Sequence, residues 1–394
     1  MEHQTSLFTN VAIWFGVAIS VSEILAGVQI ASASPIDTIW IPLILGHIVG
    51  GILLFAVGYI GAQLRVNAME SIKSTFGNYG SKFFAFLNVL QLIAWVAVLN
   101  AQGAQALMGL NLGISFPVIC IILAFLVAIW VFVGLKRTSK ITSLVMIVLT
   151  ILLILLTFKL FGLETSLTLP LSTQTLTFWN IFEVSIAMPI SWLPVISDYT
   201  KDVEKPLKAT ALSAAAYTIA SLWMYFIGVE VVSVGTVDVS QAILISGLGV
   251  QGVIILVLST VTTNFLATNS AGESAKAIFN RLNPKVTGVI VSILSALLAI
   301  SGIMDHYIDF LYLISSVFAP MAAVLLVSYY VGSNNNTKDW YWNIFAWLCG
   351  FIVYQITVNM DSIVLGPTLL AVIVSASLAY VWIKLNELKF FNDI

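Results

Sequence analysis

The architecture follows from residues 14–31 (WFGVAISVSEILAGVQIA) and residues 178–200 (FWNIFEVSIAMPISWLPVISDYT). Each stretch is apolar enough to lie in a membrane, and each is interrupted at its centre. The first has the polar run Ser20-Val21-Ser22-Glu23, and the second has Pro189 and Pro194 in its body. Proline removes a helix hydrogen bond and clashes with the preceding turn, so we expect a break near residues 188–192. Such backbone is tolerated in a bilayer only where protein shields it or it lines a cavity.

The rest of the chain is equally apolar. Of its 394 residues, 60% are hydrophobic and only 9% are charged, whereas soluble domains carry roughly 25% charged residues. Apolar runs of the ~20 residues that cross a bilayer recur along it. We predict an all-α polytopic membrane protein with twelve transmembrane helices, at residues 9–32, 38–62, 82–109, 114–135, 140–161, 176–198, 207–234, 239–271, 286–304, 307–331, 340–359 and 362–385.

The distribution of basic residues predicts the orientation. With the N-terminus in the cytoplasm, twelve spans place every Lys and Arg on the cytoplasmic side except Lys159, as the positive-inside rule requires. The C-terminus is then also cytoplasmic. We therefore expect a multi-pass protein of the cytoplasmic (inner) membrane, without the basic patch that binding of nucleic acid needs.

The two interrupted spans are the first and the sixth, so five spans separate them and they run in opposite directions. Interrupted segments at matching places in two halves are the best sequence indication of a transporter binding site. We predict a single transporter domain over residues 1–394. It comprises repeat one (about 9–161), repeat two (about 176–331) and two extra helices (about 340–385).

Polar residues at membrane depth supply the candidate ligand site. Glu23 is costly there, so a role in binding a ligand amino group or carrying a proton is expected; the alternative is a carboxylate satisfied by backbone N–H groups. The third predicted span carries a polar stripe that includes Gln91 and Trp95, and the indole offers a flat surface for a planar ring. Asn269, in the eighth span, is within reach of a ligand.

The eighth span also suggests a cation site. Ser259, Thr262 and Thr263 stand at i, i+3 and i+4, and hydroxyl and carbonyl oxygens are hard ligands that suit an alkali cation. Together with carbonyls freed in the first span, they predict Na⁺ as the coupling ion. No catalytic triad, CxxC pair, HExxH or phosphate loop occurs in the sequence, so we do not expect an enzyme.

Four segments resemble one family. They are WFGVAISVSEILAG (14–27), QLIAWVAVLNAQGAQAL (91–107), SWLPVISDYTK (191–201) and STVTTNFLATNSAG (259–272). They resemble the nucleobase:cation symporter-1 family, and most of all its CytX-type branch, associated with hydroxymethylpyrimidine, the pyrimidine precursor of thiamine. The resemblance covers essentially all twelve spans. It implies a LeuT-type fold of two inverted five-helix repeats, with broken first and sixth helices, that works by alternating access.

The resemblance also implies roles for single residues. Trp95 matches the family's stacking tryptophan, and Thr262 and Thr263 match its sodium-binding hydroxyl pair. The resemblance further implies sodium ligation by the carbonyls of Gly16, Ile19 and Ser259, and a ligand wall over residues 187–191, with Ala187, Met188 and Ser191. Ser20, in the polar run of the first stretch, is also expected to contact the ligand. Met188-Pro189 stands where the hydantoin and allantoin members have a second stacking tryptophan, so a sandwich of two indoles is not implied.

Together these observations predict a secondary active transporter that imports a small planar aminopyrimidine, hydroxymethylpyrimidine, by Na⁺ symport. Its partners are the small-molecule substrate and the lipid bilayer, and no obligate protein partner is implied. One alternative is a cytosine or nucleobase symporter. Another is H⁺-coupled transport with Glu23 as the proton carrier.

Overall fold

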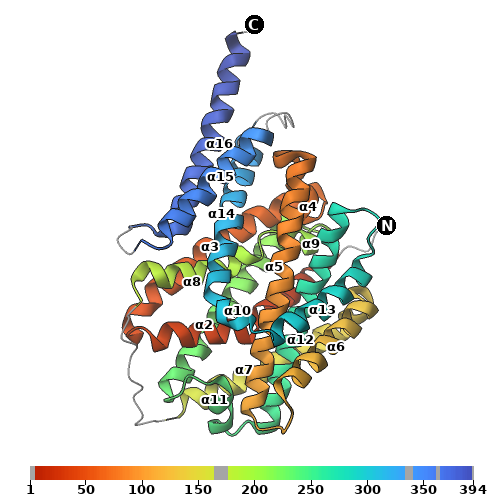
Figure 1. Cartoon of the computed structure of the whole chain (residues 1–394), viewed down its shortest axis with the longest axis vertical. Coiled ribbons are helices and arrows are strands. Elements are labelled where there is room, and N and C mark those ends of the chain that lie inside the picture. The colour runs from red at the N-terminus through yellow and green to blue at the C-terminus, as the bar shows by residue number, and fades with distance from the viewer. Residues whose placement is uncertain (1–4, 164–175, 333–339, 361–363, 393–394) are drawn as a thin grey trace.

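The computed structural model describes residues 5–163, 176–332, 340–360 and 364–392, and these are helical almost throughout (Figure 1). They contain no strand, only a single bridge between Thr5 and Val203. The helices, in chain order, are α1 (Leu7–Ala18), α2 (Val21–Ser32), α3 (Ile36–Leu64), α4 (Ala68–Ser71), α5 (Lys73–Gly109), α6 (Phe116–Val133), α7 (Leu135–Phe161), α8 (Phe178–Ser191), α9 (Ile196–Thr200), α10 (Pro206–Ser233), α11 (Val239–Ile245), α12 (Gly249–Ile278), α13 (Pro284–Ile300), η1 (Ile303–His306), α14 (Tyr307–Tyr330), α15 (Trp340–Thr357) and α16 (Gly366–Asn392).

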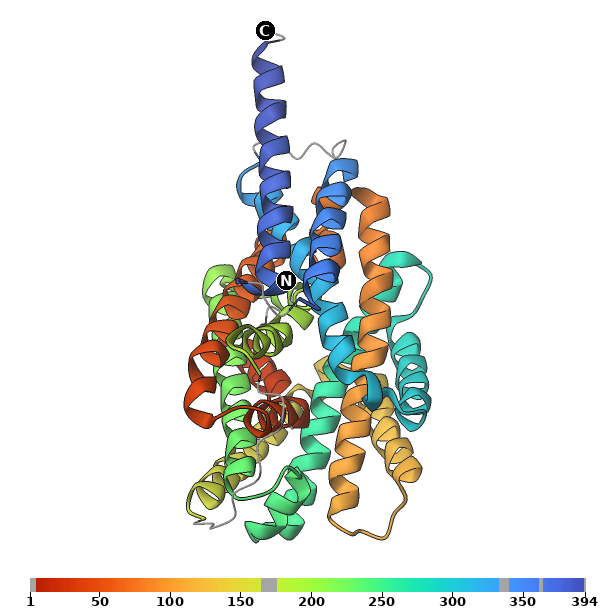
Figure 2. The same cartoon turned by 60° about the vertical axis from the view of Figure 1, so that its left-hand side comes forward.

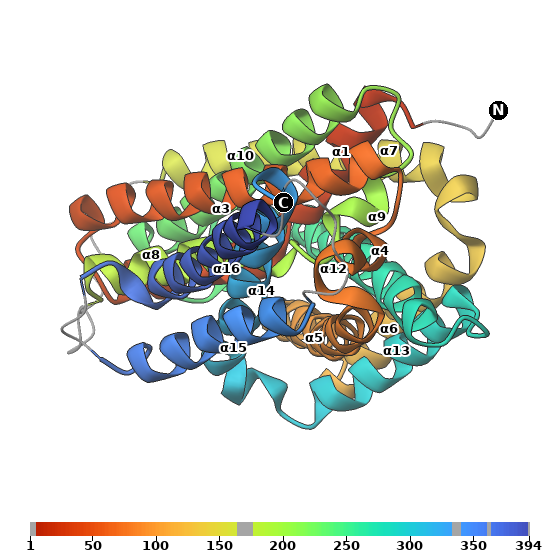
Figure 3. The ribbon, with the colours of Figure 1, turned by 90° about the horizontal axis from the view of Figure 1, so that it is seen from above.

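The helices form two groups. In the first, α3 packs along α8 and α9, and α10 packs against α1, α2 and α3; in the second, α5 packs along α12 and α13, and α13 packs along α6. Figure 3 shows α3 and α10 on one side of the molecule and α5, α6 and α13 on the other. The helices α1 and α2 contact both groups, so the interrupted first stretch lies between them.

The interruption of the first stretch has a local cause. Helix α1 ends at Ala18, and Ser20 then adopts an extended backbone (φ −129°, ψ 154°), with its side chain accepting a hydrogen bond from the N–H of Glu23. Serine followed three residues later by glutamate is the sequence of a capping box, which starts a new helix. As a result, α1 and α2 meet at an angle of 47°.

The interruption near the sixth expected span lies later than residues 188–192. Helix α8 continues through Pro189 and ends at Ser191, and α9 begins at Ile196. Pro189 is tolerated because its ring fits beside Gly50 of α3, where a Cβ would come within 2.3 Å of it. Pro194, which has no N–H to donate, lies in the four-residue gap and prevents the helix from continuing.

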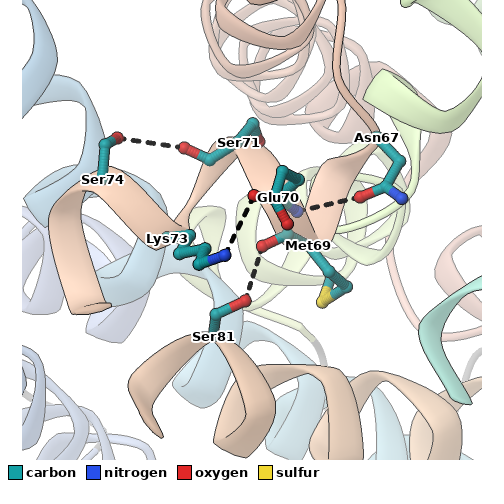
Figure 4. Close-up of polar contacts among 7 residues, drawn as sticks. All are labelled: Asn67, Met69, Glu70, Ser71, Lys73, Ser74 and Ser81. Carbon is teal, nitrogen blue, oxygen red and sulfur yellow. Dashed lines mark hydrogen bonds and ion pairs between the residues drawn. The ribbon is translucent and has the colours of Figure 1, made fainter. Parts of the chain in front are cut away.

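Two other expected spans differ in their ends. The third expected span begins at residue 82, whereas α5 begins at Lys73 and has a non-helical residue at Gly77 (φ 67°). The eighth expected span is two helices, because Gly247 takes a positive φ of 76° between α11 and α12. The N-terminal end of α5 is fastened to the preceding turn, where Ser81 donates to the carbonyl of Met69 and Lys73 reaches Glu70 (Figure 4).

Helix lengths fit a membrane protein. Within the described ranges, eight helical segments are long and apolar enough to cross a bilayer, or nine if α1 and α2 count as one span. Helices α15 and α16 pack on each other and on α14, and α16 extends beyond the other helices (Figures 1 and 2). The chain is therefore a multi-pass membrane protein, and the count of twelve spans stays a prediction.

Candidate functional site

A small cavity lies where the two helix groups meet at the interrupted stretches. The first stretch contributes Val17, Ser20, Ser22 and Glu23; α5 contributes Trp95 and Leu99; the remaining walls are Met188, Trp192 and Thr263. These residues surround a cavity of only about 10 Å³. This space is too small for a ring-sized ligand, so the walls must move apart to bind one.

Two tryptophans from different groups face this cavity. Trp95 of α5 is held from behind by Phe310, with ring centroids 5.4 Å apart at 71°. Trp192, in the gap after α8, packs edge-on against Trp14 of α1 at 5.9 Å and 88°. Such edge-to-face packing fixes the orientation of each indole at the cavity wall. Both side chains are more than nine-tenths buried.

Glu23 places a carboxyl group at the edge of the same cavity. The hydroxyl of Ser20 hydrogen-bonds Oε2, and the hydroxyl of Tyr217 hydrogen-bonds Oε1 at 3.3 Å. Glu23 is only 3% exposed. A buried carboxyl group is expensive unless it is hydrogen-bonded, and this one is placed where a ligand amino group can reach it.

Oxygen atoms gather between α12 and the end of α1. The hydroxyl of Ser259 donates to the carbonyl of Ile19 at 2.9 Å, and that of Thr263 donates to the carbonyl of Val17 at 3.4 Å. The last carbonyls of a helix lack partners within the helix. The carbonyl oxygens of Val17 and Ile19 can therefore also contact a cation beside the two hydroxyl groups. The set consists of uncharged hard oxygens, which fits an alkali cation.

Two further residues were expected at the cation site. The hydroxyl of Thr262 donates back to its own helix, to the carbonyl of Leu258 at 2.7 Å and to that of Ser259 at 3.2 Å. Gly16 lies in α1 where α7 packs closely, because a Cβ there would lie 2.3 Å from Sδ of Met146, and the role of its carbonyl stays a prediction. The structure therefore brings Ile19, Ser259 and Thr263 together and places Val17 beside them.

The expected ligand residues divide into three sets. Ser20, Glu23, Trp95 and Met188 line the cavity. Gln91 and Ser191 lie next to it and are joined, because the Gln91 amide donates to the Ser191 carbonyl at 3.1 Å. Ala187 is buried in α8 but is not part of the lining, and Asn269 reaches Tyr199 at 3.4 Å instead.

Glu183 does not belong to this site. Its carboxylate accepts hydrogen bonds from the N–H and the hydroxyl of Thr368, at 3.0 and 2.6 Å. Thr368 is in the first turn of α16, where backbone N–H groups have no partner within the helix and a nearby negative charge is favourable. Glu183 thus joins α8 to α16.

A second, larger cavity of about 760 Å³ opens between the start of α5 and the end of α12. Its lining includes Glu70, Lys73 and Ser81; Figure 4 shows the ion pair of Lys73 with Glu70 and the hydrogen bond from Ser81 to the carbonyl of Met69. It also includes Lys276 and Arg281 but no aromatic pair. This charged surface suits water better than a neutral planar ring, so we place the ligand site at the smaller cavity.

The comparison with protein families decides the class. Residues 2–366 match the model of the family described as permease for cytosine/purines, uracil, thiamine, allantoin. The chain is a member of this permease family. The permease is therefore a membrane transporter and not an enzyme, as its sequence predicts. No curated protein matches it.

Solved structures show the fold of the permease. It is similar to Mhp1, a nucleobase-cation-symport-1 family transporter, in a closed conformation with bromovinylhydantoin bound (TM-score 0.77, 21% identity, 97% of this chain and 93% of that one). The inward-facing conformation of Mhp1 gives a TM-score of 0.78 at 19% identity, over 98% and 92% of the chains. A Na⁺-coupled sialic acid symporter in a substrate-bound outward-open state gives 0.71 at 14%, over 97% and 90%. The LeuT-type helical fold is thus confirmed.

Sequence reasoning missed Val17, Ser22, Leu99 and Trp192 of the cavity lining, and also Tyr217 behind it. Trp192 provides the second indole of the cavity, three residues after the proline at which the break was expected. A tryptophan within a proline-bounded gap at membrane depth was the available signal. Tyr217, which holds Glu23, gives no sequence signal because 194 residues separate the two.

Proposed function

We propose that this permease is a secondary active transporter that imports a small planar aminopyrimidine, hydroxymethylpyrimidine, together with Na⁺ by alternating access. The observation that carries the proposal is the pairing of Trp95 and Trp192 around one cavity, with the carboxyl group of Glu23 at its edge. Two indoles suit a flat ring, and a carboxyl group suits an amino substituent on that ring.

Polar groups around the cavity would then form hydrogen bonds with the edge of the ring. We propose Ser20, Glu23, Gln91 and Ser191 as the polar part of the ligand site, with Ala187 and Met188 as its wall. Asn269 would join the site only if α12 shifted, since its amide now contacts Tyr199. An amino-bearing ring gains hydrogen bonds from this set that a ring lacking the amino group does not.

Sodium is the proposed coupling ion. We propose that Ile19, Ser259 and Thr263 hold it together with the carbonyl of Val17. Thr262 and the carbonyl of Gly16, which the sequence also indicates, would join them only after a rearrangement, since the Thr262 hydroxyl now donates to its own helix. An ion that joins α1 to α12 ties the two helix groups together. Ion and ligand would then favour the same conformation and bind cooperatively, because linkage requires each to raise the affinity for the other by the same factor.

The proposed topology is twelve spans in the cytoplasmic membrane with both termini in the cytoplasm. Residues of about 9–161 and 176–331 form the two inverted repeats, and about 340–385 the extra helices. Support comes from the sequence: twelve spans would put every basic residue except Lys159 on the cytoplasmic side. The first repeat contains α1 to α7 and the second α8 to α14, each opening with an interrupted pair.

A second candidate substrate is cytosine or another nucleobase. The family description names cytosine, purines and uracil beside thiamine, and cytosine also presents an amino group on a planar pyrimidine. The hydroxymethyl substituent is what distinguishes the two ligands.

Calorimetry on purified protein tests the proposal. We expect hydroxymethylpyrimidine to bind in NaCl and to bind more weakly when choline replaces sodium. Trp95→Ala should abolish binding, whereas Trp130→Ala, which removes a tryptophan that packs against Phe265 instead, should retain it. Equal binding by wild type and Trp95→Ala would refute the site, and tighter binding of cytosine would move the substrate to the nucleobases.

A further inference from the structure

The gap between α8 and α9 leaves the carbonyls of Ser191 and Pro194 without their helical partners. In a continuous helix each carbonyl accepts from the N–H four residues further on, which here would be Val195 and Asp198. Instead, Val195 donates to the carbonyl of Trp192 at 3.0 Å, and Asp198 donates to that of Val195 at 2.9 Å. The two carbonyls on either side of Trp192 are therefore open to donors from outside the segment.

Two side-chain amides of α5 supply the missing donors. Asn88 donates through Nδ2 to the carbonyl of Pro194 at 3.2 Å, and Gln91 donates through Nε2 to that of Ser191 at 3.1 Å. The amides are also joined to each other, because Nε2 of Gln91 donates to Oδ1 of Asn88 at 2.8 Å. Both side chains are buried. A buried carbonyl group without a donor is costly, so this pair of amides stabilises the interrupted backbone.

The carbonyl groups determine which way each amide points. A carbonyl oxygen can only accept, so Asn88 turns its NH₂ group to Pro194 and its Oδ1 to Gln91. Gln91 then faces two acceptors, Oδ1 of Asn88 and the carbonyl of Ser191, and uses both hydrogens of its amide on them. Its Oε1 is buried and has no hydrogen-bond partner among the described residues. The Gln91 amide can therefore act toward a ligand only as an acceptor.

The amide pair joins the two helix groups. Helix α5 belongs to the second group, whereas α8 and α9 pack along α3 of the first. The other hydrogen of the Asn88 amide goes to the hydroxyl of Ser274 at 2.8 Å, in α12, which packs along α5. Asn88 is thus held between α5 and α12, and its position determines that of the backbone after α8.

We propose that Asn88 is a positioning residue of the ligand site, which holds Trp192 at the cavity. Trp192 lies between the two carbonyls that the amides hold, and it lines the cavity together with Trp95. Asn88 and Trp95 are seven residues apart on α5, which is two turns on the same face of the helix. The hydrogen bonds of the amide pair therefore set the distance between the two indoles.

Loss of the Asn88 amide should weaken ligand binding without removing a contact to the ligand. Asn88 is not part of the cavity lining, so its effect must come through Trp192. We expect the Kd for hydroxymethylpyrimidine to rise roughly two- to tenfold, the factor that corresponds to one hydrogen bond. This expectation rests on the proposed function, whereas the position of Trp192 does not, and the two are tested separately.

Fluorine NMR of the full-length protein labelled with fluorotryptophan tests the position of Trp192 without a ligand. The chain has 11 tryptophans, and Trp192→Phe identifies the signal of Trp192. Asn88→Leu has nearly the same side-chain volume but no donor. In this variant we expect the Trp192 signal to shift and to broaden or split, because the carbonyl of Pro194 loses its donor.

Asn100→Leu is the matched control. Asn100 is also a buried asparagine of α5 that donates to a backbone carbonyl, that of Cys120 in α6 at 3.1 Å. Both variants should unfold at a lower temperature than wild type, but Asn100→Leu should leave the Trp192 signal and the Kd unchanged. An unchanged Trp192 signal in Asn88→Leu, or an equal shift in Asn100→Leu, would overturn the proposal.

Gln91→Met provides a second test if Asn88→Leu does not fold. It removes the donor to Ser191 and keeps the bond from Asn88 to Pro194, so the Trp192 signal should shift by a smaller amount. An unchanged signal in this variant would also contradict the proposal.

Calorimetry with hydroxymethylpyrimidine tests the effect on the ligand. Equal affinity of Asn88→Leu and wild type would contradict a positioning role in binding. Absence of binding by wild type would instead refute the proposed substrate, and the NMR comparison would still decide whether Asn88 holds Trp192.

Discussion

Replacing Thr263 by alanine removes one hydroxyl oxygen from the proposed ion site and leaves the ligand cavity otherwise intact. That oxygen lies 3.4 Å from the carbonyl of Val17, at the end of α1. A contact between a polar group and a charge contributes about 1.5–3 kcal/mol. The sodium concentration for half-maximal binding should therefore rise by about tenfold to 150-fold.

The assay is calorimetric or fluorescence titration of sodium at fixed ligand, followed by titration of ligand at fixed sodium. Ligand affinity should fall at low sodium and recover when sodium is saturating, because the two equilibria are linked. Thr260→Ala is the matched control: it removes the same hydroxyl from α12, but that side chain faces Gly103 of α5. A sodium dependence of Thr263→Ala equal to that of wild type would refute the ion site.

Three further results are expected. Trp95→Ala should abolish uptake in proteoliposomes while the protein stays monodisperse on size-exclusion chromatography, and uptake at the wild-type rate would remove Trp95 from the site. Gln91→Leu should lower stability by about 1–3 kcal/mol, seen as earlier thermal unfolding, because the Ser191 carbonyl loses its donor; unchanged unfolding would contradict this. Gly228→Ala should lower the free energy of unfolding by about 1–3 kcal/mol, because its Cβ would lie 2.1 Å from the carbonyl oxygen of Ile24 in α2. Gly249→Ala is the control, since a Cβ there meets open space and stability should not change. Equal unfolding temperatures of the two variants would argue against close packing of α10 on α2.

The helices and the first break could be predicted from sequence because their causes are local. Apolar runs set the helices, and Ser20 followed by Glu23 three residues on contains the information for a new helix start. The class of protein was also predictable, since an apolar chain with so few charges has no soluble alternative.

Contacts between distant segments were not predictable. Glu183 lies in an apolar stretch, and nothing near it in the sequence indicates its contact with Thr368, which is 185 residues away. His47 stands alone in an apolar run of the sequence, whereas its hydrogen-bond partners Ser185 and Ser221 come from α8 and α10. Met188 and Trp192 face the same cavity because α8 continues through Pro189, which depends on the glycine of α3 that accepts the ring. In each case the contact depends on how separate helices pack together, which the sequence of a single segment does not determine.

Uptake of labelled hydroxymethylpyrimidine into proteoliposomes tests the central claim most directly. The account predicts uptake that requires an inward sodium gradient and that excess unlabelled cytosine does not block. Uptake that is indifferent to sodium and follows the pH gradient, or that cytosine blocks, would contradict it.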